Sequence, residues 1–321
     1  MSPLRWVFLL LLMSASVWLA LSIYRPGLAN YAQRQAAPAA LPGDQLTATW
    51  LGVSAVLLRA GDDAVLIDPF FTRPPGLLPM MFNRPIQPDE ARISQWLQRL
   101  DLRRLDAVLV SHSHFDHAMD AGVVARMTGA RLIGSESTLN IGRGAGLSSS
   151  LLHRVEPQQA IEAGPFRITF FASRHAGATG GRPLGEIEVP LPTPAKYLDY
   201  RLGGTYSILV EHAQGTVLHH GSAGFEPGML ADVRAGTVFL GVALIDELEP
   251  YLQQTVDAVG ARVVVPVHWD DFTRPLDQPL RSFPLAVDLD EFFEDMARTR
   301  PQVQVMTLGL AQPTDLFLRK P

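Results

Sequence analysis

The spacing of apolar and polar residues along the chain predicts many short strands with helices between them. Apolar runs that are flanked by Gly, Pro, Asp or Ser are typical of strands. In the first half of the chain they lie at 47–51, 55–59, 64–67, 105–110 and 131–134. In the second half they lie at 166–172, 205–211, 216–220, 237–242 and 263–267. The first three runs are separated only by tight turns, which indicates an antiparallel start to a sheet.

Helical periodicity occurs between these predicted strands. Residues 89–100 place apolar side chains at the i, i+3, i+4 and i+7 positions of one buried face. Further helices are expected at 118–128 and 249–259. This alternation of predicted strands and helices is typical of a layered α/β domain, which we expect over residues 45–321.

The N-terminal segment has a different character. Residues 6–24 contain no charge and are about as long as a helix that crosses a bilayer. We expect residues 1–25 to be a transmembrane anchor or a signal, and an anchor is favoured because no clear cleavage site follows. The expected location is the cell inner membrane, as a single-pass protein with a periplasmic catalytic domain. A cleaved signal would instead release the domain into the periplasm.

Several segments rich in proline or glycine lack an apolar period. Residues 26–44 are predicted to be a linker between the N-terminal segment and the domain. Residues 70–88 and 177–204 are predicted to be long loops, because their prolines disfavour helices and central strands. The glycines at 142–146 are predicted to lie in an ordinary flexible loop rather than in a nucleotide-binding turn.

Composition and charge narrow the classes of function. A chain of 321 residues with 47% apolar content can bury a substantial core. The net charge of -5 and the lack of basic clusters argue against nucleic acid as a partner. The absence of cysteine excludes disulfides, thiolate zinc sites and a cysteine nucleophile, so any metal must be held by His, Asp or Glu. Nothing in the sequence indicates an oligomeric state.

The most distinctive polar cluster follows the predicted strand at 105–110. It contains His112, His114, Asp116 and His117. Imidazole and carboxylate groups suit zinc and its first-row neighbours, and three or four of them around an open position make a catalytic metal site. Side chains alternate along extended backbone, so His112 and His114 can project to the same side. We interpret the cluster as a site for one or two ions; the alternative is a solvated His-rich turn.

Two later histidines are also candidates for metal ligands. His175 follows the apolar run 166–172, and His268 follows the run 263–267. A side chain at such a strand end is brought to the common edge of the sheets. Taken alone, each of them is as readily a structural histidine.

The motif His112-x-His114-x-Asp116-His117 resembles the signature of the metallo-β-lactamase-fold hydrolases. The chain is most similar to the branch of L-ascorbate-6-phosphate lactonases and N-acyl-phosphatidylethanolamine phospholipase D-like enzymes. This resemblance implies a four-layer αββα sandwich with two zinc ions at one edge. It implies a first ion bound by His112, His114 and His175. It implies a second ion bound by Asp116, His117 and His268.

One position departs from that pattern, because Ser222 stands where the superfamily normally has a bridging aspartate. A neutral hydroxyl is a poorer ligand than a carboxylate, so the second metal should be weakened most. Two metals bridged only by hydroxide, a single metal, and loss of catalysis are all compatible with the sequence. So are a substitute ligand such as His220 and compensation by Asp270 or Asp271 from behind the ligands.

Hydrolysis is the chemistry that such a site supports. Zinc or another divalent metal supplies bound hydroxide near neutral pH and stabilises the developing oxyanion. Asp116 is expected to ligate metal and to orient the attacking water or accept its proton, and His220 or Asp270 is expected to shuttle the proton.

The expected substrate is a small molecule with a phosphodiester or a lactone or ester bond. It is expected to be lipid-like, because apolar residues within 77–82 and 186–200 should flank the metal edge and a membrane is an expected partner. The alternative is a membrane-tethered module that binds metal or a partner and has lost catalysis.

Overall fold

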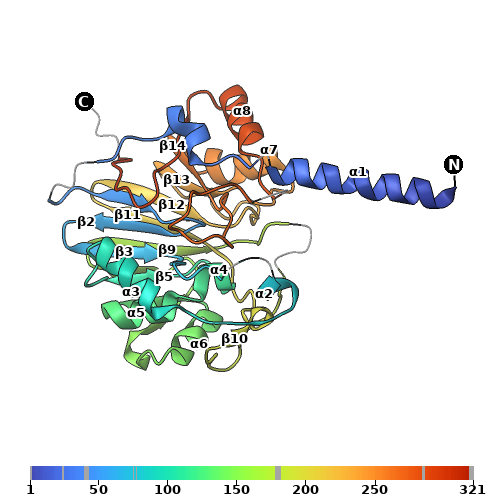
Figure 1. Ribbon diagram of the computed structural model, residues 1–321. Coiled ribbons are helices and arrows are strands. Elements are labelled where there is room, and N and C mark those ends of the chain that lie inside the picture. The colour runs from blue at the N-terminus through green and yellow to red at the C-terminus, as the bar shows by residue number, and fades with distance from the viewer. Residues whose placement is uncertain are drawn as a thin grey trace.

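Two β-sheets packed face to face form the centre of the molecule, and helices cover both outer faces (Figure 1). The computed structural model describes residues 2–23, 25–39, 43–74, 76, 78–177, 182–283 and 286–317. Over these residues the predicted four-layer αββα sandwich is confirmed. Parts of the predicted anchor, linker and loops fall on residues 1, 24, 40–42, 75, 77 and 178–181, which lie outside the described residues.

The first sheet has the strand order β1-β2-β3-β5-β6-β7. Its strands are β1 (Thr47–Trp50), β2 (Val56–Ala60), β3 (Asp63–Ile67), β5 (Ala107–Leu109), β6 (Arg131–Gly134) and β7 (Leu152–Arg154). The first three strands pair antiparallel, as predicted, and β3, β5, β6 and β7 pair parallel. The carboxyl ends of β3 and β5 therefore lie at the same edge.

The second sheet has the order β15-β14-β13-β12-β11-β9-β8. Its strands are β8 (Ala160–Ala163), β9 (Phe166–Ala172), β11 (Tyr206–His212), β12 (Gly215–His220), β13 (Thr237–Gly241), β14 (Val263–Val267) and β15 (Gln304–Val305). Strands β12 to β15 pair parallel, and the remaining pairs are antiparallel. Strand β14 is buried along its whole length, which accounts for its unbroken apolar sequence.

Helices lie on the outer face of each sheet (Figure 1). The first sheet is covered by α3 (Glu90–Arg99), α5 (Ala121–Thr128) and α6 (Glu136–Gly144). The second is covered by α7 (Leu248–Leu252), its π-helical continuation η4 (Gln253–Asp257) and α8 (Leu289–Thr299). The remaining short elements are η1 (Leu28–Arg34), α2 (Leu78–Met81), β4 (Pro85–Ile86), α4 (Phe115–Ala118), η2 (Ser149–Leu151), β10 (Ala195–Lys196) and η3 (Tyr197–Asp199).

The glycine-rich stretch is not the flexible loop that the sequence predicted. Its first residues form the last turn of α6, where the lack of side chains permits close packing. A Cβ on Gly144 would lie 1.8 Å from the carbonyl oxygen of Leu191, and one on Gly142 would lie 2.6 Å from a methyl group of Leu132. Gly144 therefore allows the later proline-rich segment to pack directly on this helix, and Gly142 allows the helix to pack closely on β6.

The segment predicted to be a linker packs against the domain instead. Within η1 the ring of Tyr31 is buried 5.2 Å from the ring of Phe293, and the guanidinium of Arg34 lies 4.6 Å from the centre of that same ring. Arg25 forms an ion pair with Asp271. Burial of an aromatic ring together with a cation–π contact fixes this segment, although its composition is typical of a linker.

The N-terminal helix α1 (Pro3–Ile23) projects away from the sandwich (Figure 1). Large apolar side chains along it, such as Trp6, Phe8 and Leu11, are exposed. Among the residues that the structure describes, no helix is long and apolar enough to cross a membrane. The predicted transmembrane helix is therefore not supported.

Candidate metal centre

Six metal-ligand side chains meet in two groups at one edge of the sandwich. The first group is His112, His114 and His175; the second is Asp116, His117 and His268. In each group the candidate ligand atoms lie within 4.8 Å of one another. The structure thus brings together all six predicted ligands, from the turn after β5, from the end of β9 and from the end of β14.

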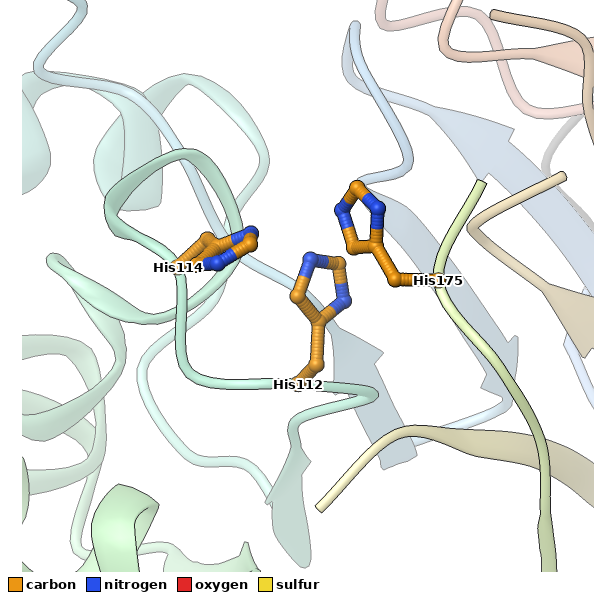
Figure 2. A group of neighbouring side chains, drawn as sticks. All are labelled: His112, His114 and His175. Carbon is orange, nitrogen blue, oxygen red and sulfur yellow. The ribbon is translucent and has the colours of Figure 1, made fainter. Parts of the chain in front are cut away.

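Three imidazole rings converge in the first group, which we call the histidine triad (Figure 2). The ring of His112 lies 4.8 Å from that of His114 and 4.9 Å from that of His175, measured between centroids. The predicted alternative, a solvated turn, is wrong, because His112 and His114 are buried.

Hydrogen bonds to backbone carbonyls orient two of these rings. Nδ1 of His175 lies 2.8 Å from the carbonyl oxygen of Ala176, and Nε2 of His114 lies 3.3 Å from that of Pro183. Such contacts fix the orientation and the tautomer of a ring that binds metal through its other nitrogen. Nε2 of His112 is buried with no hydrogen-bond partner in the described part of the chain, which is costly unless a ligand binds it.

The second group, which we call the aspartate triad, is held by a buried carboxylate behind it. Nδ1 of His117 lies 2.8 Å from Oδ2 of Asp68, and its Nε2 is buried without a partner among the described residues. Nε2 of His268 lies 3.2 Å from Oδ2 of Asp116. Asp68 is itself fixed, because it accepts hydrogen bonds from the backbone N–H and the hydroxyl of Ser111. Asp68 directly follows the predicted strand at 64–67, and sequence reasoning assigned it no part in holding the site.

A buried ion pair supports the loop that carries His268. The backbone N–H of His268 donates to the carbonyl of Val53, and the N–H of Val53 donates to Oδ1 of Asp270. The other carboxylate oxygen of Asp270 lies 2.7 Å from Arg73, and neither of these two side chains is exposed. Sequence reasoning missed Arg73, because it lies in a proline-rich segment about 200 residues from its partner.

Burial and neighbouring histidines keep two rings of the histidine triad neutral. Burial, together with the neighbouring His117, lowers the pKa of His112 well below its usual value. Burial, together with His114, lowers the pKa of His175 to about 4. Both rings are therefore deprotonated near neutral pH, which is the form that binds metal.

In the aspartate triad, neighbouring opposite charges outweigh the effect of burial on the pKa values. Burial alone would raise the pKa of Asp116, but the adjacent His117 and His268 hold it below its usual range, so this carboxylate is ionised. Burial alone would lower the pKa of His117, but Asp116 and Asp68 raise it. Five imidazoles and one carboxylate form a donor set that suits zinc or another first-row divalent ion.

The other predicted residues lie near the triads but have protein partners. Oγ of Ser222 accepts a hydrogen bond from the N–H of Ala176 at 3.0 Å. His220 is buried, with Nδ1 2.7 Å from Oγ of Ser207 and Nε2 2.7 Å from the carbonyl oxygen of Gly224. Since both nitrogens are engaged, these contacts favour a structural role for His220. The predicted compensating carboxylates pair with arginines, Asp270 with Arg73 and Asp271 with Arg25.

Residues 48–241 match the family model of the metallo-beta-lactamase superfamily. This match covers more than half of the chain, and the chain belongs to that superfamily. His268 lies beyond the matched residues, and the structure brings it to the other five ligands.

Curated relatives are named metal-dependent hydrolases. The chain is 24% identical over 235 residues to a UPF0173 metal-dependent hydrolase of Aeropyrum pernix, which covers 70% of this chain and 82% of that protein. It is 25% identical to one of Desulforamulus reducens, over 75% of this chain and 91% of that protein. These similarities agree with the donor set found at the sheet edge.

Solved structures share the fold at low sequence identity. Igni18, a metallo hydrolase of Ignicoccus hospitalis, has a TM-score of 0.56 at 16% identity, over 84% of this chain and 97% of that chain. The metallo-beta-lactamase fold protein YhfI of Bacillus subtilis has a TM-score of 0.52 at 14% identity, over 84% and 98%. At such identities the similarity shows the fold alone.

Proposed function

We propose that this protein is a metal-dependent hydrolase that cleaves a phosphodiester, lactone or ester bond in an amphiphilic small molecule. The observation that carries the proposal is the pair of triads, in which Nε2 of His112 and Nε2 of His117 are buried without hydrogen-bond partners among the residues that the structure describes. Buried polar atoms of this kind are costly unless a ligand binds them, and imidazole nitrogens in this arrangement fit a divalent metal.

The residues of the site would have two roles, namely binding of the metal and interaction with the attacking water. The triads would hold a divalent metal, which would lower the pKa of bound water and polarise a carbonyl or phosphoryl oxygen. Asp116 is the ionised carboxylate of the site, so it can ligate metal and accept a hydrogen bond from the attacking water. Asp68 orients His117 without facing the substrate, because it is fully buried behind that ring.

Two proline-rich segments form a common structure beside the histidine triad, which we call the cap (residues 78–88 and 183–204). Strand β4 pairs with β10, and the N–H of Leu198 donates to Oδ1 of Asn83. The cap is joined to the metal motif, because the N–H of Ser113 donates to the carbonyl of Leu202. It is thus a fixed wall next to the ligands.

The cap exposes apolar side chains that would suit the apolar part of a substrate. Met81 is 71% exposed, Phe82 64% and Leu198 46%. They lie close together, because Leu198 is hydrogen-bonded to the residue after Phe82. Exposed groups of this kind are typical of a surface that binds an apolar ligand.

A cavity of about 680 Å³ lies next to the segment that follows His175, although none of the six candidate ligands lines it. Its wall includes Gly177, which is two residues after His175, and Phe283. The ring of Phe283 stacks on that of Phe272 at 4.8 Å, and Phe272 lies 6.3 Å from the ring of His268. The volume is in the range of sites for small molecules.

Metal content measured together with hydrolysis tests the proposal. Purified protein is loaded with zinc and assayed with a chromogenic phosphodiester, an aryl ester and a lactone. We expect turnover of at least one substrate, loss of that turnover in His114→Ala, and wild-type turnover in His153→Ala. His153 is a matched control, because it is a half-buried histidine on β7 outside both triads.

Two results would contradict the proposal. Equal activity in His114→Ala would show that the triads do not catalyse the reaction. Bound metal with no turnover of any substrate class would favour the alternative, a metal-binding module without catalysis.

Membrane association and a periplasmic location stay predictions from the sequence. Recovery of the full-length protein in the membrane fraction, with release by detergent, is the expected result. Recovery in the soluble fraction without detergent would contradict it.

A further inference from the structure

The turn between β1 and β2, residues 51–54, has a strained backbone. Val53 has a φ of 49°, which lies in the left-handed region that glycine favours. A β-branched residue is rarely found there, and such a conformation costs free energy that the surrounding contacts must offset. Strained residues of this kind cluster at functional sites, so the contacts of this turn indicate what it does.

The backbone of Val53 holds the loop that carries the ligand from β14, in the second sheet. Its carbonyl accepts hydrogen bonds from the N–H of His268 at 2.8 Å and from the indole N–H of Trp50 at 3.0 Å. Its own N–H donates to Oδ1 of Asp270 at 2.7 Å. The left-handed conformation of Val53 is therefore stabilised by contacts with the loop that positions His268.

The side chain of the next residue, Ser54, contacts a ligand that follows β5, in the first sheet. Its Oγ lies 2.9 Å from Nδ1 of His117 and 3.2 Å from Oδ2 of Asp68, and the residue is fully buried. Nε2 of His219 donates a hydrogen bond to the carbonyl of Ser54 at 2.7 Å. The backbone of Ser54 is thus fixed, and its hydroxyl is held against the ring of His117, away from solvent.

The hydroxyl of Ser54 restrains the ring of His117 through both of its partners. A carboxylate oxygen only accepts, so the hydroxyl donates to Asp68 and its lone pairs then face Nδ1 of His117. With acceptor oxygens of both residues beside it, Nδ1 carries the proton and Nε2 carries the lone pair. That Nε2 is buried without a hydrogen-bond partner among the described residues, and it is the atom that a metal would bind.

We propose that Ser54 is a positioning residue of the aspartate triad, whose hydroxyl, together with Asp68, holds His117 in the orientation and tautomer that bind metal. This inference rests on the metal centre of the proposed function. One turn then connects ligands of two different sheets, because Val53 holds the loop of His268 and Ser54 holds His117. Backbone carbonyls orient two rings of the histidine triad, so the effect of Ser54 should be confined to the aspartate triad.

The test compares Ser54→Ala with the matched control Ser207→Ala. Each change removes a buried serine hydroxyl that contacts Nδ1 of a histidine, but the partner of Ser207 is His220, which belongs to neither triad. Zinc is titrated into the full-length proteins in competition with a chromogenic chelator. Urea unfolding and long-range proton–nitrogen NMR spectra of the histidines are measured on the metal-free proteins, at a pH where the rings are neutral.

We expect Ser54→Ala to bind zinc at the aspartate triad about 10-fold more weakly and to keep the affinity of the histidine triad, as loss of a group behind a metal-binding histidine predicts. The signal of the Nδ1 proton of His117 should shift in this variant. Ser207→Ala should match the wild type in both measurements. Both variants should lose similar stability in urea, because each loses the same kind of buried contact, so a general loss of stability would not explain the difference in zinc binding.

Unchanged zinc affinity of the aspartate triad in Ser54→Ala would overturn the assignment, and so would equal weakening in Ser207→Ala. In the wild type, a proton found on Nε2 of His117 instead of Nδ1 would also overturn it, and that measurement needs no variant. If the wild type binds no zinc, the proposed function fails, and the NMR signal of His117 in the metal-free proteins still decides whether Ser54 holds this ring.

Discussion

The two triads lie side by side, yet the protein supports them in different ways. The histidine triad contains no carboxylate, and backbone carbonyls of Ala176 and Pro183 orient two of its rings. The aspartate triad contains an ionised carboxylate, and Asp68 stands behind it. The first is thus held by local backbone, and the second by buried charges from distant parts of the chain. Substitutions of those charges should therefore affect only the second.

The largest effect is expected for Arg73→Met, which leaves Asp270 buried without its partner. Breaking a buried ion pair from one side costs about 3–5 kcal/mol, so the free energy of unfolding should fall by that amount in urea titrations. Zinc bound by the aspartate triad should weaken, because Asp270 holds the loop with His268 through Val53. Arg167→Met is the control, since its exposed ion pairs should contribute at most about 1 kcal/mol. Equal stability of the two variants would contradict this support.

The buried Asp120 belongs to neither triad, so its substitution should change the stability of the fold and leave metal binding unchanged. Burial raises its pKa to about 6, although it accepts hydrogen bonds from Phe71 and Thr72. A carboxyl whose folded pKa lies above its unfolded pKa stabilises the protein below about pH 4, and this stabilisation is lost as the pH rises through 6.

Replacing Asp120 with Asn should remove that pH dependence. The difference in unfolding free energy between wild type and Asp120→Asn should fall by up to about 3 kcal/mol from pH 4 to pH 7. Urea denaturation at several pH values measures it. A constant difference would show that the carboxyl does not titrate in this range, and a change in zinc affinity would show that Asp120 also supports a triad.

A smaller effect, confined to one triad, is expected for Asp68→Asn. Loss of the carboxylate behind His117 should weaken zinc at the aspartate triad by about 10- to 100-fold and leave the histidine triad unchanged. Competition with a chromogenic chelator resolves the two affinities. Equal weakening of both ions would show that the triads form one unit, and the distinction between them would fail.

The ligands could be predicted from the sequence, because each follows an apolar strand and four of them stand close together. The alternation of strands and helices predicted a layered α/β domain, and the resemblance to the metallo-β-lactamase-fold hydrolases implied its four αββα layers. Arg73 and Asp68 could not be assigned a role, because their contacts depend on how distant segments meet. The alternation of side chains placed His220 near the site, but it could not show that Ser207 and Gly224 occupy its nitrogens.

The structures of two segments differ from those that their composition predicted, because both segments pack against distant residues. Residues 28–34 look like a linker, but Tyr31 is buried against Phe293. Gly142 and Gly144 look like a loop, but they end a helix on which Leu191 packs closely. In both cases contacts with residues remote in the sequence accompany a structure that the local composition did not predict.

Anomalous diffraction from zinc-loaded crystals tests most directly whether the two triads bind metal. We predict one peak about 2.0–2.2 Å from nitrogens of His112, His114 and His175, and a weaker peak at that distance from the ligand atoms of Asp116, His117 and His268. Zinc-loaded crystals with no peak at either triad would contradict the metal centre and the proposed function with it.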